Sequence, residues 1–125
     1  MYENWGFDKL GKLEYEESIE EMKHADMLIK RILFLEGLPE VSNLRKILIG
    51  KDIPLQLKND HSSELGAIKE YNAAIKESTT LGDNGTREIL EDILKEEEDH
   101  TDWLESQLDQ IDQMGIQSYL VEQVS

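Results

Sequence analysis

The 125-residue sequence predicts an all-α fold, organised as one helical domain over residues 1–125. Apolar residues recur at steps of three and four over long stretches, and they almost never alternate as a strand requires. Turn-forming segments such as TTLGDNGT separate the periodic stretches. We therefore expect three long helices and one short helix.

The first helix is expected from about Trp5 to Leu35, and its apolar residues fall into two stripes. A second stripe on one helix indicates a second packing partner. Gly37 should end the helix in a left-handed conformation, because Pro39 follows closely and cannot continue it. The stripe that should face the bundle consists of Leu10, Leu13, Glu17, Glu21, His24, Leu28, Ile32 and Leu35. The other stripe consists of Ile19, Met22, Ile29 and Leu33.

The second helix should follow an extended connection over residues 38–52. Asp52 is expected to cap this helix, which has Pro54 in its first turn and reaches about Ser78. Its inward stripe consists of Leu57, His61, Glu64, Ile68, Tyr71 and Ile75.

The third helix is expected from about Thr86 to Met114, where Gly115 stops it. The segment IQSYLVEQ then predicts a short terminal helix. The inward stripe of the third helix consists of Leu90, Ile93, Glu97, His100, Leu104, Leu108 and Ile111.

The composition favours cations as partners. The chain carries 28 Asp and Glu against 13 Lys and Arg, a formal net charge of −15. Such a charge repels nucleic acid and anionic membranes, and no apolar run approaches the length of a membrane span. The absence of cysteine excludes disulfides and thiolate metal sites. No basic segment precedes an apolar one at the start, so we expect a soluble cytoplasmic protein.

The motif Glu-x-x-His occurs twice, as Glu21 with His24 and as Glu97 with His100. Residues three apart lie on one side of a helix, with β-carbons about 5–6 Å apart, so each pair can bind one divalent ion. Glu64 adds an inward carboxylate from the second helix. This is the pattern of di-iron bundles, and its oxygen and nitrogen donors suit iron or manganese and also accommodate zinc.

A simpler interpretation is that these pairs are solvated helix faces, since 33% of the residues are charged. Two pairs on otherwise apolar stripes favour metal, because a buried carboxylate without a partner is costly. His61 is either an additional ligand or an edge histidine paired with a neighbour. Trp5 and Trp103 are interpreted as packing residues.

Four segments of the chain resemble the bacterioferritins, the haem-containing bacterial ferritins. They are EYEESIEEMKHADMLIKRILFLEGLP, SSELGA, ILKEEEDHTDWLESQLDQIDQMG and IQSYLVEQ, and the resemblance extends over essentially the whole chain. It implies a ferritin-like helical bundle and an iron-storage protein. Members form a hollow shell of twenty-four subunits, oxidise Fe(II) at a di-iron ferroxidase centre within each subunit, and deposit ferric mineral inside.

The resemblance also implies roles for individual residues. It places the haem-ligand methionine at Met22, which with its twin from a second subunit would bind haem b across a twofold interface. It implies an accessory iron site at Glu16 and Glu20 on the inner surface of the shell. The catalytic metal ligands that it implies are Glu21, His24, Glu64, Glu97 and His100.

The family's first long helix, which supplies a sixth ligand, has no counterpart in this chain, whose opening MYENWG resembles the loop after that helix. The interpretations are a truncated start, a naturally shortened paralogue, or a partner that supplies the helix in trans. Three long helices would also leave an apolar face uncovered. The alternative function is a haem-binding or structural helical oligomer with an incomplete, inactive di-iron site.

Overall fold

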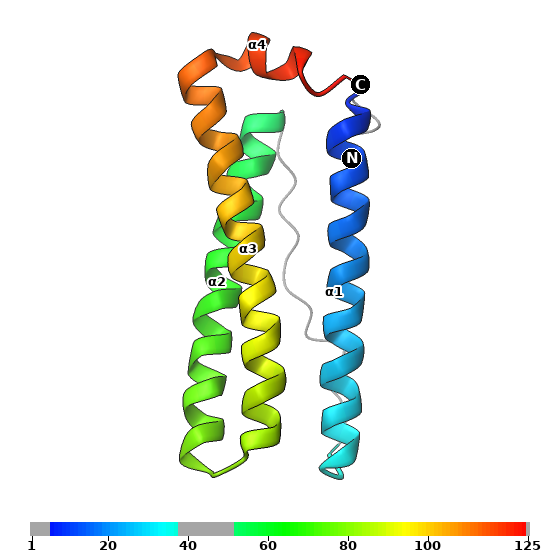
Figure 1. Ribbon diagram of the computed structural model, residues 1–125, viewed down its shortest axis with the longest axis vertical. Helices are drawn as coiled ribbons and strands as arrows, with labels where there is room; N and C mark the ends of the chain where they lie inside the picture. The colour runs from blue at the N-terminus through cyan, green and yellow to red at the C-terminus, as the bar shows by residue number, and fades with distance from the viewer. Residues whose placement is uncertain (1–5, 38–51, 125) are drawn as a thin grey trace.

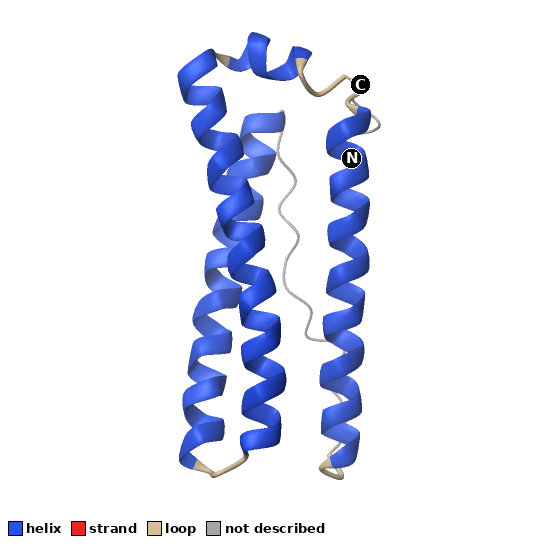
Figure 2. Ribbon diagram, viewed as in Figure 1, coloured by secondary structure: helices blue, strands red, loops and turns tan. Residues whose placement is uncertain are grey.

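The computed structural model describes residues 6–37 and 52–124, and these residues form four helices and no strand (Figure 2). The predicted all-α fold is confirmed. Trp5 and nearly all of the predicted 38–52 connection lie outside the described residues. The helices are α1 (Asp8–Phe34), α2 (Ile53–Thr80), α3 (Asn84–Met114) and α4 (Ile116–Val121).

The three long helices lie side by side, and α4 crosses one end of them (Figure 1). Helices α2 and α3 form an antiparallel hairpin and pack along each other, whereas α1 meets α3 at fewer positions. The two ends of the described chain meet near α4, where the Lys9 N–H donates to the Gln123 carbonyl at 3.3 Å. The bundle is therefore a tight pair of helices with a third helix held beside it.

Aspartates start two of the helices. Asp52 caps α2 as predicted, because its side chain accepts a hydrogen bond from the Leu55 N–H at 2.9 Å. Asp83 caps α3 and accepts from the Thr86 N–H at 3.2 Å. Helix α3 therefore begins at Asn84, two residues before the expected Thr86.

The end of α1 differs from the prediction. Glu36, and not Gly37, takes the left-handed conformation, with φ of 63°. Gly37 is needed for a different reason, since a β-carbon there would lie 3.0 Å from Cγ2 of Ile32. Its N–H donates to the Ile32 carbonyl at 2.9 Å, which closes the last turn of the helix.

An apolar core lies at the α4 end of the bundle. Tyr119 is fully buried there, and its hydroxyl donates to Oε1 of Gln107 at 2.8 Å. Burying a large apolar side chain contributes about 1.5–3 kcal/mol, so this cluster holds all four helices together. The apolar core consists of Leu10, Ile53, Leu57, Leu104 and Tyr119.

A polar clamp fastens α1 at the opposite end. Arg31 donates from Nε to Oγ1 of Thr86 and from Nη2 to Oδ1 of Asp83, both at 2.9 Å. A β-carbon on Gly85 would lie 2.5 Å from Nη2 of Arg31, so a larger residue here would displace the guanidinium from this position. The clamp, formed by Arg31, Asp83, Gly85 and Thr86, ties α1 to the loop between α2 and α3.

The inward stripe predicted for α1 is buried only in part. Leu10 and His24 are buried, but Ile32 is 36% exposed and Leu35 is 51% exposed. The prediction for these last two residues is wrong, because α1 packs chiefly against one helix, α3, and a single neighbour does not cover the stripe to its end.

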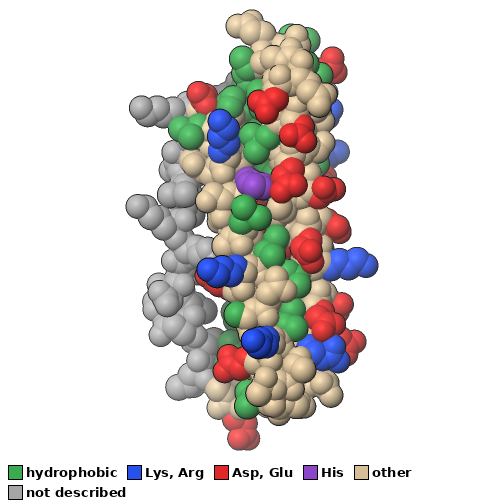
Figure 3. Space-filling model, turned by 90° about the vertical axis from the view of Figure 1, so that its left-hand side faces the viewer, with side chains coloured by type: hydrophobic (Ala, Val, Ile, Leu, Met, Phe, Trp, Pro, Cys, Tyr) green, Lys and Arg blue, Asp and Glu red, His purple; other side chains and the backbone are tan. Residues whose placement is uncertain are grey.

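The surface reflects the acidic composition. Asp and Glu side chains gather along one edge of the face that α2 and α3 present, with apolar side chains between them and the other edge (Figure 3). Among the described residues, no helix is both long enough and apolar enough to cross a bilayer.

Candidate metal centre

All five predicted metal ligands lie together in the middle of the bundle. Side chains from α1, α2 and α3 converge there and form two adjoining groups, whose donor atoms lie within 4.8 Å of one another inside each group. We call them the His24 set, formed by Glu21, His24 and Glu97, and the His100 set, formed by Glu17, Glu64 and His100.

The His24 set joins α1 to α3. Nδ1 of His24 lies 3.0 Å from Oε1 of Glu97 and 4.0 Å from Oε1 of Glu21. His24 is 4% exposed and Glu97 is 2% exposed, so two ionisable side chains are buried against each other. One imidazole nitrogen and two carboxylates thus converge on one point.

Glu96 orients His24 from the other side. Nε2 of His24 is hydrogen-bonded to Oε2 of Glu96. When Nε2–H donates to this carboxylate, Nδ1 keeps its lone pair on the side of Glu97, which is the tautomer that binds a cation. Sequence reasoning missed Glu96, although it stands directly before Glu97 in the acidic run KEEEDH.

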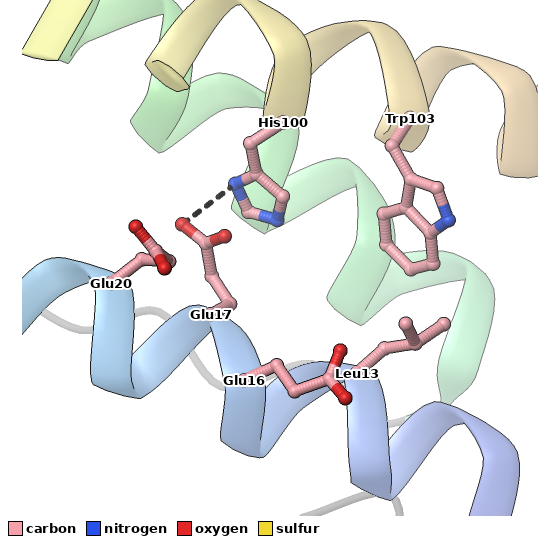
Figure 4. A pocket seen from close by; sticks show the side chains of 6 residues that line it. All are labelled: Leu13, Glu16, Glu17, Glu20, His100 and Trp103. Carbon is pink, nitrogen blue, oxygen red and sulfur yellow. Dashed lines mark ion pairs between the residues drawn. The ribbon is translucent and has the colours of Figure 1, made fainter.

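The His100 set joins all three long helices. Nδ1 of His100 lies 3.2 Å from Oε1 of Glu17 (Figure 4). The same nitrogen lies 3.4 Å from Oε1 of Glu64. Neither contact is aligned as a hydrogen bond, and Nδ1 of His100 and Oε2 of Glu64 are buried without a hydrogen-bond partner. The imidazole ring stacks on Trp103, with centroids 6.0 Å apart, which confirms Trp103 as a packing residue.

Glu17 is the second residue of the candidate centre that sequence reasoning missed. It belongs to the predicted inward stripe and stands one helical turn before Glu21. The structure shows its side chain 27% exposed and directed at His100 from the opposite helix (Figure 4). Its position on the ligand-bearing stripe was the available signal.

Three carboxyl groups of the two sets have raised pKa values. Burial is the largest cause that raises the pKa of Glu17 and of Glu21 to about 7. Burial also raises the pKa of Glu97, and the neighbouring charge of Glu64 acts in the same direction. A divalent ion would displace these protons and bind the carboxylates.

Burial and the neighbouring carboxylates also shift the pKa values of the two histidines. Burial alone would lower the pKa of His24, but the hydrogen bond to Glu96 and the nearby carboxylates raise it. Burial likewise opposes the effect of Glu64 and Glu17, which together raise the pKa of His100. Both imidazoles therefore lie where positive charge is favoured.

This donor set fits iron. Four carboxylates and two imidazoles supply the oxygen and nitrogen atoms that iron, manganese and zinc accept. The buried atoms Glu64 Oε2 and His100 Nδ1 have no hydrogen-bond partner, and a bound cation would satisfy both.

The other candidate residues lie outside these two sets. His61 pairs with Glu105 at 2.9 Å and belongs to no ligand group of the described residues, which matches the edge-histidine interpretation. Glu20 forms a third group with His24 and Glu96. Glu16 lines the neighbouring cavity of about 390 Å³ but belongs to none of the groups (Figure 4).

Met22 lies away from the candidate centre. It is 58% exposed, and Leu33 of the same predicted stripe is 55% exposed. Ile19 and Ile29 of that stripe are half-buried. The thioether of Met22 is therefore accessible on the surface of a single chain.

Fold and site together define a class of protein, the helical bundles that bind metal ions through glutamate and histidine of their own helices. The family described as "Ferritin-like domain" matches residues 1–114. The chain belongs to this ferritin-like family, among the relatives of the bacterioferritins.

Curated relatives support the assignment. A bacterial ferritin of Paramagnetospirillum magnetotacticum is 43% identical over 96% of this chain and 74% of its own length. A bacterioferritin of Brucella melitensis is 38% identical over 95% of the chain and 74% of its own length. A bacterial ferritin of Synechocystis is 40% identical over the whole chain and 81% of its own length.

Proposed function

We propose that the protein stores iron and oxidises Fe(II) at the centre formed by the His24 set and the His100 set. One observation carries this proposal: the predicted ligands converge from three helices, with His100 Nδ1 and Glu64 Oε2 buried and without hydrogen-bond partners. Relatives named bacterioferritin support the same function.

The residues of the chain prepare the site for two ions. Glu96 holds His24 so that Nδ1 faces inward, and Trp103 holds the ring of His100. The carboxyl groups of Glu17, Glu21 and Glu97, whose pKa values are raised, release protons as Fe(II), the substrate, binds. The charge of Glu64, in the His100 set, raises the pKa of Glu97, in the His24 set, so Glu97 would serve as a ligand close to both ions. Two Fe(II) ions side by side supply two electrons to dioxygen or peroxide and become Fe(III).

Storage requires more than one chain. Our proposal is that copies of this chain assemble as the family does, into a hollow shell of twenty-four subunits that holds the ferric mineral. The net charge of −15 supports this function, because an acidic surface attracts Fe(II) and raises its local concentration. The chain would then represent a bacterioferritin-type domain.

Haem binding at a subunit interface is part of the proposal. The 58% exposure of Met22 favours it, because an axial ligand shared between two subunits must be accessible on each of them. The same observation supports the alternative function, a haem-binding helical oligomer without oxidase activity. A bis-methionine haem spectrum without faster Fe(II) oxidation than in buffer would favour that alternative.

The decisive test is the variant Glu97→Ala. Removing this buried carboxylate takes a donor from the junction of both sets, so we expect Fe(II) oxidation to fall to the rate in protein-free buffer. Stopped-flow absorbance of ferric product measures the rate. Glu98→Ala, at the exposed neighbouring position, is the matched control and should oxidise Fe(II) like the unaltered chain. An unchanged rate in Glu97→Ala would refute the assignment of the centre.

A further inference from the structure

The donors predicted from the sequence are unevenly shared between the two ion positions. The His24 set contains two carboxylates and one imidazole. Of the five predicted ligands, only Glu64 and His100 remain for the other position. A second carboxylate is needed there if the two positions are to have equal donors.

Charge balance leads to the same requirement. Two divalent ions carry four positive charges, whereas Glu21, Glu64 and Glu97 supply only three negative charges. An uncompensated charge in a buried site is costly. A fourth carboxylate within reach of the buried His100 would make the loaded centre neutral.

Glu17 occupies the position where this carboxylate is needed. Its Oε1 lies 3.2 Å from Nδ1 of His100 (Figure 4), and Oε1 of Glu64, which the figure does not draw, lies 3.4 Å from the same nitrogen. A neutral imidazole nitrogen and two carboxylate oxygens repel one another through their lone pairs unless a cation or a proton lies between them. These contacts are not aligned as hydrogen bonds, so the arrangement is that of three donors around one point.

We propose that Glu17 is a metal ligand of the His100 set, so that each ion position has three donors from the described residues. The inference rests on the proposed function and assigns Glu17 a role in it.

The neighbouring acidic residues do not offer the same role. Glu16 belongs to none of the ligand groups of the described residues. Glu20 groups with His24 and Glu96 on the side of Nε2, away from the nitrogen that faces Glu97. Glu17 alone of these three approaches His100 within a ligand group.

The test is a titration of the purified 125-residue chain with Co²⁺, read by the visible absorption of the bound ion and by equilibrium dialysis. The unaltered chain should bind two Co²⁺. In Glu17→Gln, which keeps the size of the side chain and removes its charge, the second Co²⁺ should bind at least about tenfold more weakly. Glu98→Gln makes the same change on the exposed surface of α3 and should bind both ions normally.

A merely structural ion pair between Glu17 and His100 predicts a different outcome. Its loss would lower the melting temperature of the metal-free chain and leave both Co²⁺ affinities unchanged. Ligation predicts the opposite pair of results, because removing a buried carboxylate relieves the metal-free cluster. The melting temperature of metal-free Glu17→Gln should then be unchanged or higher while Co²⁺ binding weakens.

Glu97→Gln separates this inference from the proposed function. If Glu97→Gln loses Co²⁺ and Glu17→Gln binds both ions normally, Glu17 is not a ligand and the proposed centre stands. If Glu97→Gln also binds both ions normally, the centre and the role of Glu17 are refuted together. Should Glu17→Gln fail to fold, Glu17→Asp replaces it. That variant keeps the charge but withdraws the carboxylate by one methylene, and an unchanged second affinity would overturn the inference.

Discussion

The apolar core and the candidate metal centre occupy neighbouring turns of the same helices, yet they contribute in opposite ways. Leu104 of the apolar core stands one turn after His100 and one position after Trp103 on α3. The core is stable by burial alone, whereas the centre buries ionisable groups that need protons or a cation. Along the same helix stripe, apolar residues thus form a packed core, and glutamate and histidine form a candidate binding site.

The side chains of the apolar core and of the candidate centre are held in position by different kinds of contact. In the apolar core, side chains from all four helices exclude water. In the centre, positions are fixed by pairs such as His24 with Glu96 and by the stacking of Trp103 on His100. Variants in the core should therefore change stability, and variants in the centre should change ion affinity.

Leu104→Ala should give the largest effect. Leu104 is 1% exposed, and truncating such a leucine lowers the free energy of unfolding by about 2–5 kcal/mol. Urea denaturation followed by circular dichroism measures the change. Leu65→Ala, at a residue 48% exposed in α2, is the matched control and should lose much less. An equal loss in both variants would show that the apolar core is not where stability resides.

Glu96→Ala tests the candidate metal centre and should give an intermediate effect, seen in Co²⁺ affinity. Without its acceptor, His24 loses the hydrogen bond that selects the binding tautomer, so Co²⁺ affinity should fall about tenfold. The loss of affinity should lie at the lower end of the usual range of about 10–100-fold, because the side chain of Glu96 is 53% exposed. Glu98→Ala should leave the affinity unchanged, and the melting temperature of both variants should stay close to that of the unaltered chain. Normal affinity in Glu96→Ala would mean that His24 is oriented by packing alone.

The pH dependence of the metal-free chain should give the smallest effect. Folding raises the pKa of Glu17 and Glu21 from 4.5 to about 7, so the folded chain binds more protons than the unfolded chain between these values. The associated stability is present below about pH 4.5 and is lost as the pH rises through about 7. His24 and His100, whose pKa values are also raised, act in the same direction.

We therefore expect the metal-free chain to melt at a lower temperature at pH 8 than at pH 6. Solvent screens the half-exposed Glu21, so the loss should be on the order of 1 kcal/mol, which corresponds to about 5 °C. Differential scanning calorimetry at several pH values measures it. Glu17→Gln should reduce the slope, and a melting temperature that rises with pH would contradict the buried, protonated cluster.

The sequence was sufficient for the fold and for most of the centre. The ends of α2 and α3 were predicted within two residues from periodicity, the Asp52 cap and Gly115. The start of α3 was placed two residues late because the cap at Asp83 was not recognised. The repeated Glu-x-x-His motif identified candidate ligands that the structure brings together, since the spacing along a helix fixes which side chains share a face.

What the sequence did not reveal depends on distances between helices. Glu17 and Glu96 became visible as partners of His100 and His24 only when α1 and α3 were placed side by side. The acidic runs that contain them look like ordinary solvated surface. The exposure of Leu35 was missed for a related reason, because periodicity shows which face is apolar and does not show how far a neighbour covers it.

The clamp at Arg31 fixes one end of α1, so a displacement of the clamp also moves His24. Helix α1 is fixed by Leu10 in the apolar core and by Arg31 in the clamp, 21 residues apart, and His24 lies 14 residues along that span. A rigid helix that pivots at Leu10 therefore transmits two-thirds of any displacement at Arg31 to His24. Metal–ligand distances tolerate only about 0.2 Å, so a shift of about 0.3 Å at the clamp already spans that tolerance. A displacement of the first turn of α3, where Gly85 and Thr86 lie, would therefore also move His24, which stands two helical turns before Arg31 on α1.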